Sequence, residues 1–221
     1  MFVDDPQQFV PEMLEGPALA NPDTLKYVPE YNLIMRADGP DESKVSIIQG
    51  SGSGHEPAHV MIVGKGMLDA ACPGDVFAAP PFDYVYETAK LMASPKGVLL
   101  LVNNYTGDKM VFEMAEEMSS ADGIEVKTPF INDDVSVEDS TYTIGRRGVA
   151  GNFFVIKAVG AASERGAILK PRAQRRARLQ ETGAVHAAAS YAQQHPEPAE
   201  PHAALPARPH HRTRWRPRRA V

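Results

Sequence analysis

The run Val98–Val102 most constrains what this chain can fold into, because its residues are apolar without interruption. Such a run is typical of a β-strand that is covered on both faces. Other apolar runs bounded by turn residues predict strands at residues 32–35, 45–48 and 124–131. Helical spacing of apolar residues predicts helices that begin after Asp5 and at residues 83–92, 109–118 and 152–165. Strands that alternate with helices indicate an α/β fold with a largely parallel sheet and flanking helices.

Two of these helices carry further signals. Asp5-Pro6 combines a carboxylate that can cap a helix with a proline suited to the first helical position. In the helix at residues 109–118, one apolar stripe is expected to face the sheet. The stripe consists of Val111, Met114, Ala115 and Met118.

The chain changes character near residue 166. Residues 170–221 contain 11 Lys and Arg against 3 Glu, a net charge of +8, whereas the first 169 residues have a net charge of −13. We therefore divide the chain into a folded domain at residues 1–166 and a disordered basic tail at residues 167–221, which has almost no apolar periodicity. The basic run at residues 210–219 is a candidate contact for nucleic acid or anionic lipid. A solvated tail is the simpler interpretation, and we expect no nucleic-acid partner.

Several absences indicate the compartment. Cys72 has no second cysteine to pair with, so the chain has no internal disulfide. No apolar run approaches the ~18–20 residues needed to cross a membrane. The N-terminal Met-Phe-Val-Asp-Asp-Pro lacks the basic start and apolar stretch of a signal peptide. These features predict a soluble cytoplasmic protein without membrane contact.

The segment after the strand at residues 45–48 is rich in glycine. Gly50, Gly52 and Gly54 allow the chain to turn sharply and its N–H groups to approach a ligand. Such a turn at the carboxyl end of a strand is where open α/β sheets bind ligands, and it would bring His55 to the rim of the crevice. A structural turn with an exposed histidine is the alternative. The spacing fits neither the dinucleotide fingerprint nor a phosphate loop, so we expect no nucleotide on this chain.

The sequence His55-Glu56-Pro57-Ala58-His59 also matches the zinc-peptidase motif H-E-x-x-H. That motif needs both histidines on one helical face, but a helix could begin only at Pro57, which leaves His55 outside it. No third ligand stands out before the tail. We therefore disfavour a zinc peptidase and expect no metal.

A second polar segment, Asn103–Asp108, follows the Val98–Val102 strand, so its side chains are expected at the same edge of the sheet as His55. A carboxylate and an imidazole in one crevice can perform acid–base chemistry on a hydroxyl, although Asp108 is also a candidate helix cap. Residues 132–139 form an acidic loop, either solvated or a cation site. Residues 145–148 hold two arginines that suit a carboxylate across an interface, or that acidic loop.

Six blocks in order resemble the dihydroxyacetone-binding (DhaK-type) subunit of dihydroxyacetone kinases, also called glycerone kinases. They lie at residues 52–57, 64–68, 74–77, 104–108, 133–139 and 143–150, and the resemblance covers residues 2–166. It implies a small ketose such as dihydroxyacetone as substrate. It further implies that His55 hydrogen-bonds a substrate hydroxyl and accepts a proton, and that Asp108 orients or deprotonates the hydroxyl that receives phosphate. Gly52, Ser53 and Gly54 would contact the substrate through backbone groups.

The resemblance also implies how the phosphoryl donor is supplied. ATP, or phosphate from a phosphotransferase system, is held with Mg²⁺ on a separate nucleotide-binding subunit or fused domain. This chain would then bind no cofactor itself and would form a homodimer.

The sequence departs from the family pattern in two places. Many relatives have lysine where this chain has Asn103, whose amide can still hydrogen-bond a ketose oxygen but supplies no charge. The preferred ketose is therefore left open, with a four-carbon ketose such as erythrulose as one candidate. Relatives also continue with more α/β sequence, including a Gly-Ile-His-Gly-type segment that bears a histidine bound covalently to the substrate. No histidine of the tail lies in such a context, so we assign no covalent histidine to this chain.

These departures suggest that residues 167–221 are translated in a shifted reading frame of a GC-rich gene, and that kinase activity is impaired. Sequencing downstream of codon 166 tests this, because another frame should then encode the missing α/β sequence. The alternative function is a non-catalytic binding or coregulatory protein derived from the same family.

Overall fold

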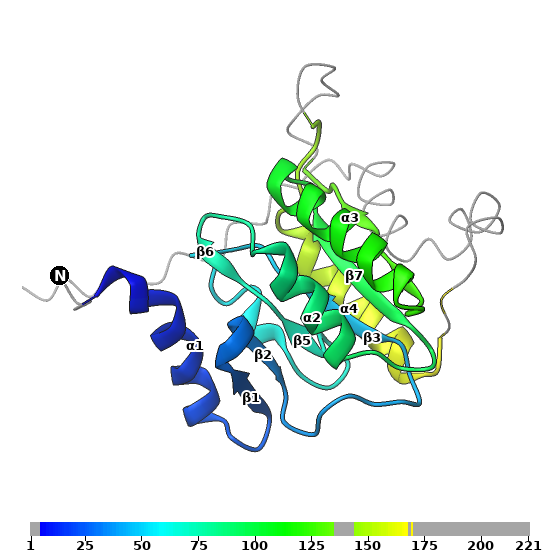
Figure 1. The fold of residues 1–221 in the computed structure, drawn as a ribbon, viewed down its shortest axis with the longest axis horizontal. Coiled ribbons are helices and arrows are strands. Elements are labelled where there is room, and N and C mark those ends of the chain that lie inside the picture. The colour runs from blue at the N-terminus through cyan, green and yellow to red at the C-terminus, as the bar shows by residue number, and fades with distance from the viewer. Residues whose placement is uncertain (1–4, 135–143, 168, 170–221) are drawn as a thin grey trace, which may run out of the picture.

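A seven-stranded sheet forms the centre of the computed structural model, which describes residues 5–134, 144–167 and 169 (Figure 1). Its order is β1-β2-β5-β3-β7-β8, and β9 also pairs with β7. The strands are β1 (Leu25–Val28), β2 (Leu33–Arg36), β3 (Ser46–Gln49), β5 (Ala70–Ala71), β7 (Val98–Asn103), β8 (Val126–Lys127) and β9 (Phe130–Ile131). A second, two-stranded sheet pairs β4 (Gly52–Ser53) with β6 (Gly74–Val76).

Four α-helices lie in the described part of the chain: α1 (Phe9–Ala20), α2 (Phe82–Leu91), α3 (Thr106–Ala121) and α4 (Gly151–Glu164). Short 3-10 helices are η1 (Pro6–Gln8), η2 (Pro29–Tyr31) and η3 (Val60–Ile62). The predicted start at Asp5 is confirmed, because its carboxylate accepts a hydrogen bond from the Gln7 N–H at 2.9 Å. Within the described residues, no helix is both long and apolar enough to cross a membrane.

The centre of the sheet is parallel and one edge is antiparallel. β3 pairs in parallel with β5 and β7, and β7 pairs in parallel with β8 and β9. β2 joins β5 in the antiparallel sense, and β1 follows β2 in a hairpin. The predicted α/β fold with a largely parallel sheet and flanking helices is thus confirmed. The predicted basic tail falls almost wholly outside the described residues.

The single strand predicted at residues 124–131 is wrong in one respect, because the structure has two short strands there. β8 pairs with the start of β7 and β9 with its end. Between them, Pro129 has no N–H to donate to a ladder. Its carbonyl oxygen still accepts from the Val102 N–H at 3.2 Å, so the segment follows β7 despite the interruption.

Two apolar layers cover the sheet, and β7 contributes to both. Val98, Leu100 and Val102 pack with α2 and α3, whereas Leu101 packs with α1 and α4. Figure 1 shows α2 and α3 in front of the sheet and α4 behind it. The unbroken apolar run is therefore a strand buried on both faces, as predicted.

The stripe predicted for α3 is wrong by part of a turn. Phe112 and Ala115 are buried against the sheet, together with the polar Asp108 and Ser119. Met110, Met114 and Met118 are exposed on the opposite side. The error has a physical cause, since two of the buried positions are polar and carry no hydrophobic signal.

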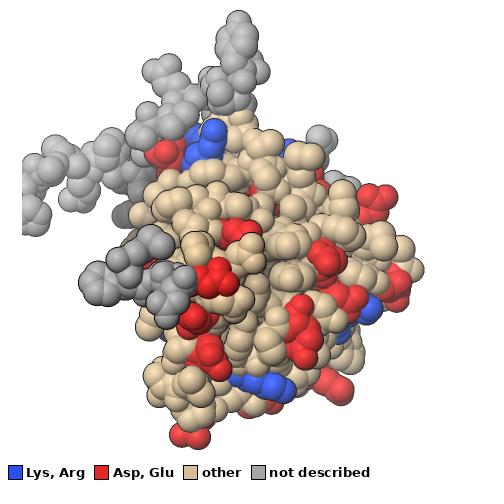
Figure 2. Space-filling model, turned by 60° about the vertical axis from the view of Figure 1, so that its left-hand side comes forward, with Lys and Arg blue, Asp and Glu red and all other residues tan. Residues whose placement is uncertain are grey.

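Acidic side chains dominate the face shown in Figure 2, where few lysines and arginines lie between them. This distribution agrees with the net charge of −13 of the first 169 residues. Several basic side chains of the folded part are instead buried or paired.

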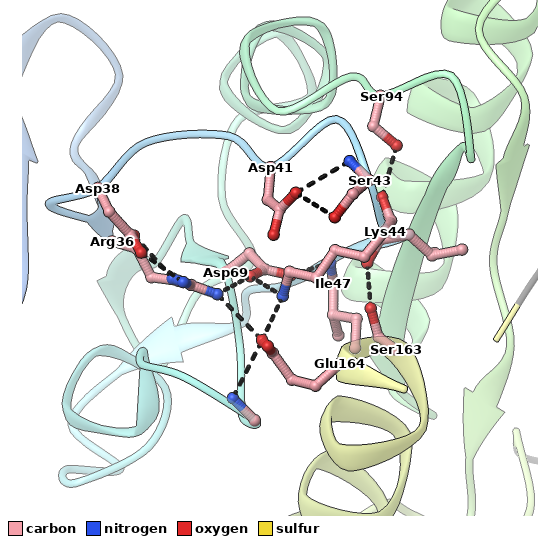
Figure 3. Close-up of polar contacts among 12 residues, drawn as sticks. Arg36, Asp38, Asp41, Ser43, Lys44, Ile47, Asp69, Ser94, Ser163 and Glu164 are labelled. Carbon is pink, nitrogen blue, oxygen red and sulfur yellow. Dashed lines mark hydrogen bonds and ion pairs between the residues drawn. The ribbon is translucent and has the colours of Figure 1, made fainter. Parts of the chain in front are cut away.

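One set of paired charges, which we call the ion cluster, lies at the amino ends of β3 and β5 (Figure 3). It consists of Arg36, Lys44, Asp69 and Glu164. Lys44 Nζ lies 2.6 Å from Asp69 Oδ1 and 2.7 Å from Glu164 Oε1, and Arg36 Nη1 lies 3.0 and 3.1 Å from the same two oxygens. Asp69 Oδ2 accepts from the Ile47 N–H at 2.8 Å. Burial raises the pKa of Glu164, but the hydrogen bond and charge of Lys44 outweigh it, so the net pKa is lowered.

Candidate active site

A cavity of about 560 Å³ opens at the carboxyl ends of β3 and β7, at the edge of the sheet opposite the ion cluster. The loop after β3 and the start of α3 supply its polar side chains. Its lining residues are Ser51, Gly52, His55, Ala58, His59, Phe77, Ala79, Asn103, Tyr105, Gly107, Asp108, Gly148, Val149, Ala150 and Asn152. The two predicted polar segments therefore do meet at one edge of the sheet.

The glycine-rich loop has its shape because side chains do not fit there. A Cβ atom on Gly52 would lie 2.6 Å from the backbone nitrogen of Ala78, so only glycine allows β4 and the segment after β6 to approach this closely. Gly54 has φ +96°, a conformation that L side chains rarely adopt. The loop consequently turns back at Gly54 and places His55 beside the cavity.

Asp108 is the buried carboxylate of the site. It lies in the first turn of α3, is 3% exposed, and accepts a hydrogen bond from Ser51 Oγ at 2.7 Å. Burial raises its pKa from 3.8 to about 6, against the lowering influence of the Ser51 hydroxyl and His55. The group is therefore mostly ionised at neutral pH and remains basic enough to take up a proton. It is not the cap of α3, a position that Tyr105 occupies.

His55 is exposed at the rim, and its ring orientation is defined by two contacts. Nδ1 lies 2.8 Å from the carbonyl oxygen of Gly52, and the ring meets Phe77 edge to face with centroids 5.3 Å apart. A carbonyl oxygen can only accept, so Nδ1 carries the hydrogen and Nε2 is the nitrogen with a free lone pair. Nε2 can therefore accept a proton from a bound hydroxyl.

His59 lies deeper and belongs to a buried polar network. Its Nδ1 lies 2.7 Å from Gln49 Oε1, and Gln49 Nε2 donates to Asn152 Oδ1 at 2.7 Å. Burial lowers the pKa of His59 to about 4, with a further contribution from His55, so the ring is neutral at physiological pH.

The histidines at 55 and 59 do not form a zinc-peptidase site. Both precede η3 and lie in a turn, so they do not share a helical face. Among the described residues, no group of three or more His, Cys, Asp and Glu side chains is arranged to hold a metal ion.

Asn103 ends β7 and is 7% exposed. Its Oδ1 is buried and has no hydrogen-bond partner among the described residues, although the residue lines the cavity. A buried acceptor without a partner costs roughly 1–3 kcal/mol, which a ligand hydroxyl could recover. The neighbouring Asn104 has a structural role, because its Nδ2 donates hydrogen bonds to the carbonyl oxygens of Ile144 and Arg146 at 3.0 and 2.7 Å.

The structure brings four of the predicted site residues together at the cavity: Gly52, His55, Asn103 and Asp108. It does not bring the other two there. Ser53 Oγ donates to the carbonyl oxygen of Gly74 at 2.6 Å, and the Gly54 N–H donates to Glu56 Oε1 at 3.1 Å.

Sequence reasoning missed other polar lining residues, namely Ser51, His59, Tyr105 and Asn152. For Ser51 a signal existed, because it directly follows the β3 strand at the ligand-binding edge. Asn152 carried no such signal, since it lies more than forty residues beyond either motif on a different element.

The acidic loop at residues 132–139 and the two arginines at residues 145–148 have partly structural roles. Asp133 accepts hydrogen bonds from the Val149 and Gly151 N–H groups at 2.8 and 2.7 Å, which fixes the start of α4. Arg147 lies over the Tyr105 ring, 5.8 Å from its centroid. The remainder of the acidic loop, residues 135–139, lies outside the described residues.

The fold and the cavity define the class of this protein: an α/β domain with a cavity at the carboxyl edge of its sheet, lined by side chains of the kinds that perform acid–base chemistry. The sequence profile of the Dak1 domain matches residues 15–209. The chain belongs to the Dak1 domain family. The boundary predicted at residue 166 stays a prediction.

Individual relatives agree with the family assignment. The chain is 47% identical over 166 residues to the dihydroxyacetone-binding subunit DhaK of the PEP-dependent dihydroxyacetone kinase of Escherichia coli K12, which covers 75% of this chain and 46% of that protein. It thus spans about half the length of the curated relatives it matches.

Solved structures share the fold. The dihydroxyacetone kinase of Citrobacter freundii in complex with AMP-PNP and Mg²⁺ matches with a TM-score of 0.72 and 35% identity, over 88% of this chain and 34% of that one. The dihydroxyacetone kinase operon co-activator Dha-DhaQ matches with a TM-score of 0.67 and 37% identity, over 72% of this chain and 48% of that one.

Proposed function

We propose that this chain is the ketose-binding part of a dihydroxyacetone kinase and that the cavity at the ends of β3 and β7 holds the substrate. The observation that carries the proposal is the convergence of Asp108, His55 and the unpartnered Asn103 Oδ1 on one cavity. These groups can bind hydroxyls and accept a proton, which is what phosphorylation of a polyhydroxy ketone requires. The names of the relatives supply the substrate class.

In the proposed reaction, Asn103 Oδ1 accepts a hydrogen bond from one substrate hydroxyl and His55 Nε2 from another. Asp108 removes the proton of the hydroxyl that attacks phosphorus. Gly52, and with it Ser53 and Gly54, would contribute backbone groups, although only Gly52 lines the cavity.

The phosphoryl donor is proposed to be bound elsewhere, by a nucleotide-binding subunit or domain that also holds Mg²⁺. The Citrobacter freundii kinase, solved with AMP-PNP and Mg²⁺, supports a nucleotide donor in the family. The donor must reach the cavity from outside the domain. The position of the cavity at the edge of the sheet permits this approach. The proposal includes a homodimer and a cytoplasmic location, where nucleotide donors are available.

In the proposed complex, hydrogen bonds from these side chains hold the substrate. Three or four bonds worth ~1 kcal/mol each correspond to a Kd on the order of 1 mM. Titration calorimetry of residues 1–221 with dihydroxyacetone, with glycerol as control, tests binding. Addition of a relative's nucleotide-binding subunit with ATP and Mg²⁺, or with its phosphotransferase donor, tests turnover. Absence of both binding and turnover would contradict the proposal.

A second candidate function is coregulation of transcription without catalysis. The similarity to the operon co-activator Dha-DhaQ favours it, at an identity comparable to that of the kinase. The same cavity would then act as a ketose sensor. A pull-down with a transcription regulator and with a nucleotide-binding kinase subunit separates the two functions, because each predicts a different partner.

A further inference from the structure

Two buried serines in the glycine-rich segment have different partners. Ser51 Oγ donates to Asp108 Oδ2 at 2.7 Å and thereby joins the loop after β3 to the first turn of α3. Ser53 Oγ donates to the carbonyl oxygen of Gly74 and is not a lining residue of the cavity. Only the first serine contacts a group that can accept a proton from substrate.

We propose that Ser51 is a positioning residue for phosphoryl transfer: its hydroxyl holds Oδ2 of Asp108 and leaves Oδ1 to take the proton of the ketose hydroxyl. This inference rests on the proposed function. In the reaction step, the substrate O–H bond breaks, the proton goes to Asp108, and the substrate oxygen forms a bond to phosphorus. The bond from phosphorus to the leaving oxygen of the nucleotide donor breaks, and that oxygen keeps the electron pair.

The geometry supports this role because Ser51 and Asp108 are both buried, at 7% and 3% exposed, and both line the cavity. A carboxylate attached to a helix can rotate about its side-chain bonds, and one fixed oxygen restricts that rotation. The hydroxyl also stabilises the charged form of a carboxylate whose pKa burial raises to about 6. Ser51 thus affects both the direction of the base and the fraction that is ionised.

Two titratable groups on other elements also interact with Asp108. His55, from the loop after β4, lowers its pKa. Cys72 follows β5, and burial, with a smaller contribution from the charge of Asp108, raises the pKa of its thiol to about 12, so the thiol stays neutral. Neither group replaces the hydrogen bond from Ser51 to Asp108. A substitution of Ser51 therefore tests the contribution of this hydrogen bond by itself.

The experiment compares Ser51→Ala with Ser163→Ala, which removes a buried hydroxyl outside the cavity lining that bonds only the carbonyl oxygen of Val45 in the described contacts. Ser51→Thr serves as the rescue variant because it keeps the hydroxyl. Each full-length protein is combined with the nucleotide-binding subunit, and kcat is measured from pH 5 to pH 9. The Asp108 carboxyl carbon is followed by NMR over the same range in the chain alone.

We expect Ser51→Ala to move the acid limb of the profile, and the Asp108 titration, upward by about one pH unit, as the loss of a hydrogen bond to a charged group predicts. Turnover should fall about fivefold at pH 6 and only slightly at pH 8. Ser51→Thr should restore both curves and Ser163→Ala should leave them unchanged. Equal shifts in the two alanine variants, or none in Ser51→Ala, would overturn the inference.

Failure of the proposed function is distinguishable from failure of this inference. If the unsubstituted protein transfers no phosphate to a ketose, the kinase proposal fails, and with it the catalytic part of the role of Ser51. The NMR titration still decides whether Ser51 controls the ionisation of Asp108. A titration of Asp108 that is the same in Ser51→Ala would overturn that part as well.

Discussion

The two ends of the sheet hold buried charges in opposite ways. At the amino ends of β3 and β5, two cations share the carboxylates of Asp69 and Glu164, each within 3.1 Å of both, and Arg36 also pairs with the more exposed Asp38. At the carboxyl ends, Asp108 is buried without a cation and only the Ser51 hydroxyl is within hydrogen-bond distance in the described contacts. Charge compensation makes the first end structural, and its absence leaves the second end reactive.

The difference predicts that substitutions at the two ends affect different measurements. Loss of a partner in the ion cluster should lower stability and spare the chemistry. Loss of a cavity residue should impair the chemistry and leave stability unchanged or higher. Four predictions test this contrast.

The largest effect is expected for Asp69→Asn, which removes the buried carboxylate that Lys44 and Arg36 share and leaves them only Glu164 and the more exposed Asp38. The free energy of unfolding should fall by about 3 kcal/mol, the cost typical of a broken buried ion pair. Urea denaturation measures it. Asp41→Asn is the control, because the Asp41 carboxylate bonds only the nearby exposed Ser43 in the described contacts and should cost much less. Equal losses of unfolding free energy in the two variants would show that the ion cluster contributes no more to stability than an exposed carboxylate does.

His55→Ala should reduce phosphoryl transfer by about a hundredfold or more, the usual contribution of a positioned acid–base group. The unfolding free energy should stay nearly constant because the ring is exposed. A reconstituted kinase assay beside a denaturation curve checks both parts. Unchanged turnover would remove His55 from the mechanism.

Asp108→Asn should abolish the proton acceptor and also stabilise the fold at alkaline pH. The folded pKa is raised from 3.8 to about 6, so the native state loses stability as pH rises through this window. The neutral amide escapes this loss, and the variant should gain about 3 kcal/mol at pH 8 and almost nothing below pH 4. Thermal denaturation at both pH values measures the gain. A variant less stable at pH 8 than the unsubstituted protein contradicts the prediction.

The smallest effect is expected for His59→Gln, and it has the opposite pH dependence. The folded pKa of His59 is lowered from 6.5 to about 4, so its contribution is complete above pH 6.5 and is lost as pH falls toward 4. The variant should therefore lose about 2 kcal/mol less stability than the unsubstituted protein between pH 7 and pH 5. Parallel stability curves for the two proteins over this range would contradict it.

The sequence predicted the fold best where the hydrophobic pattern of a segment matched the burial of its side chains. Val98–Val102 predicts a doubly covered strand because all its side chains are apolar, and the structure confirms it. The stripe of α3 was misplaced because Asp108 and Ser119 occupy buried positions that a hydrophobic pattern assigns to solvent. β5 has only Ala70 and Ala71, too short a segment to be detected by periodicity.

The candidate site was predictable to the extent that it follows strands. His55 and Asp108 were found because each lies in a polar segment just after a strand of the parallel centre. The sequence did not distinguish Ser51 from Ser53, because both serines lie between glycines of the same loop. Only the folded structure shows that the Ser51 hydroxyl reaches Asp108 and the Ser53 hydroxyl reaches Gly74. His59 was considered only as a metal ligand, because its bond to Gln49 depends on tertiary structure.

The ion cluster has a consequence for the order in which the chain is made. Glu164 pairs with Arg36 and Lys44, which precede it by 128 and 120 residues. A ribosome therefore releases both cations long before it adds the carboxylate that completes their set, and during that interval Lys44 and Arg36 lack one of their shared carboxylates. Nascent chains should therefore reach full protease resistance only after α4 has left the exit tunnel.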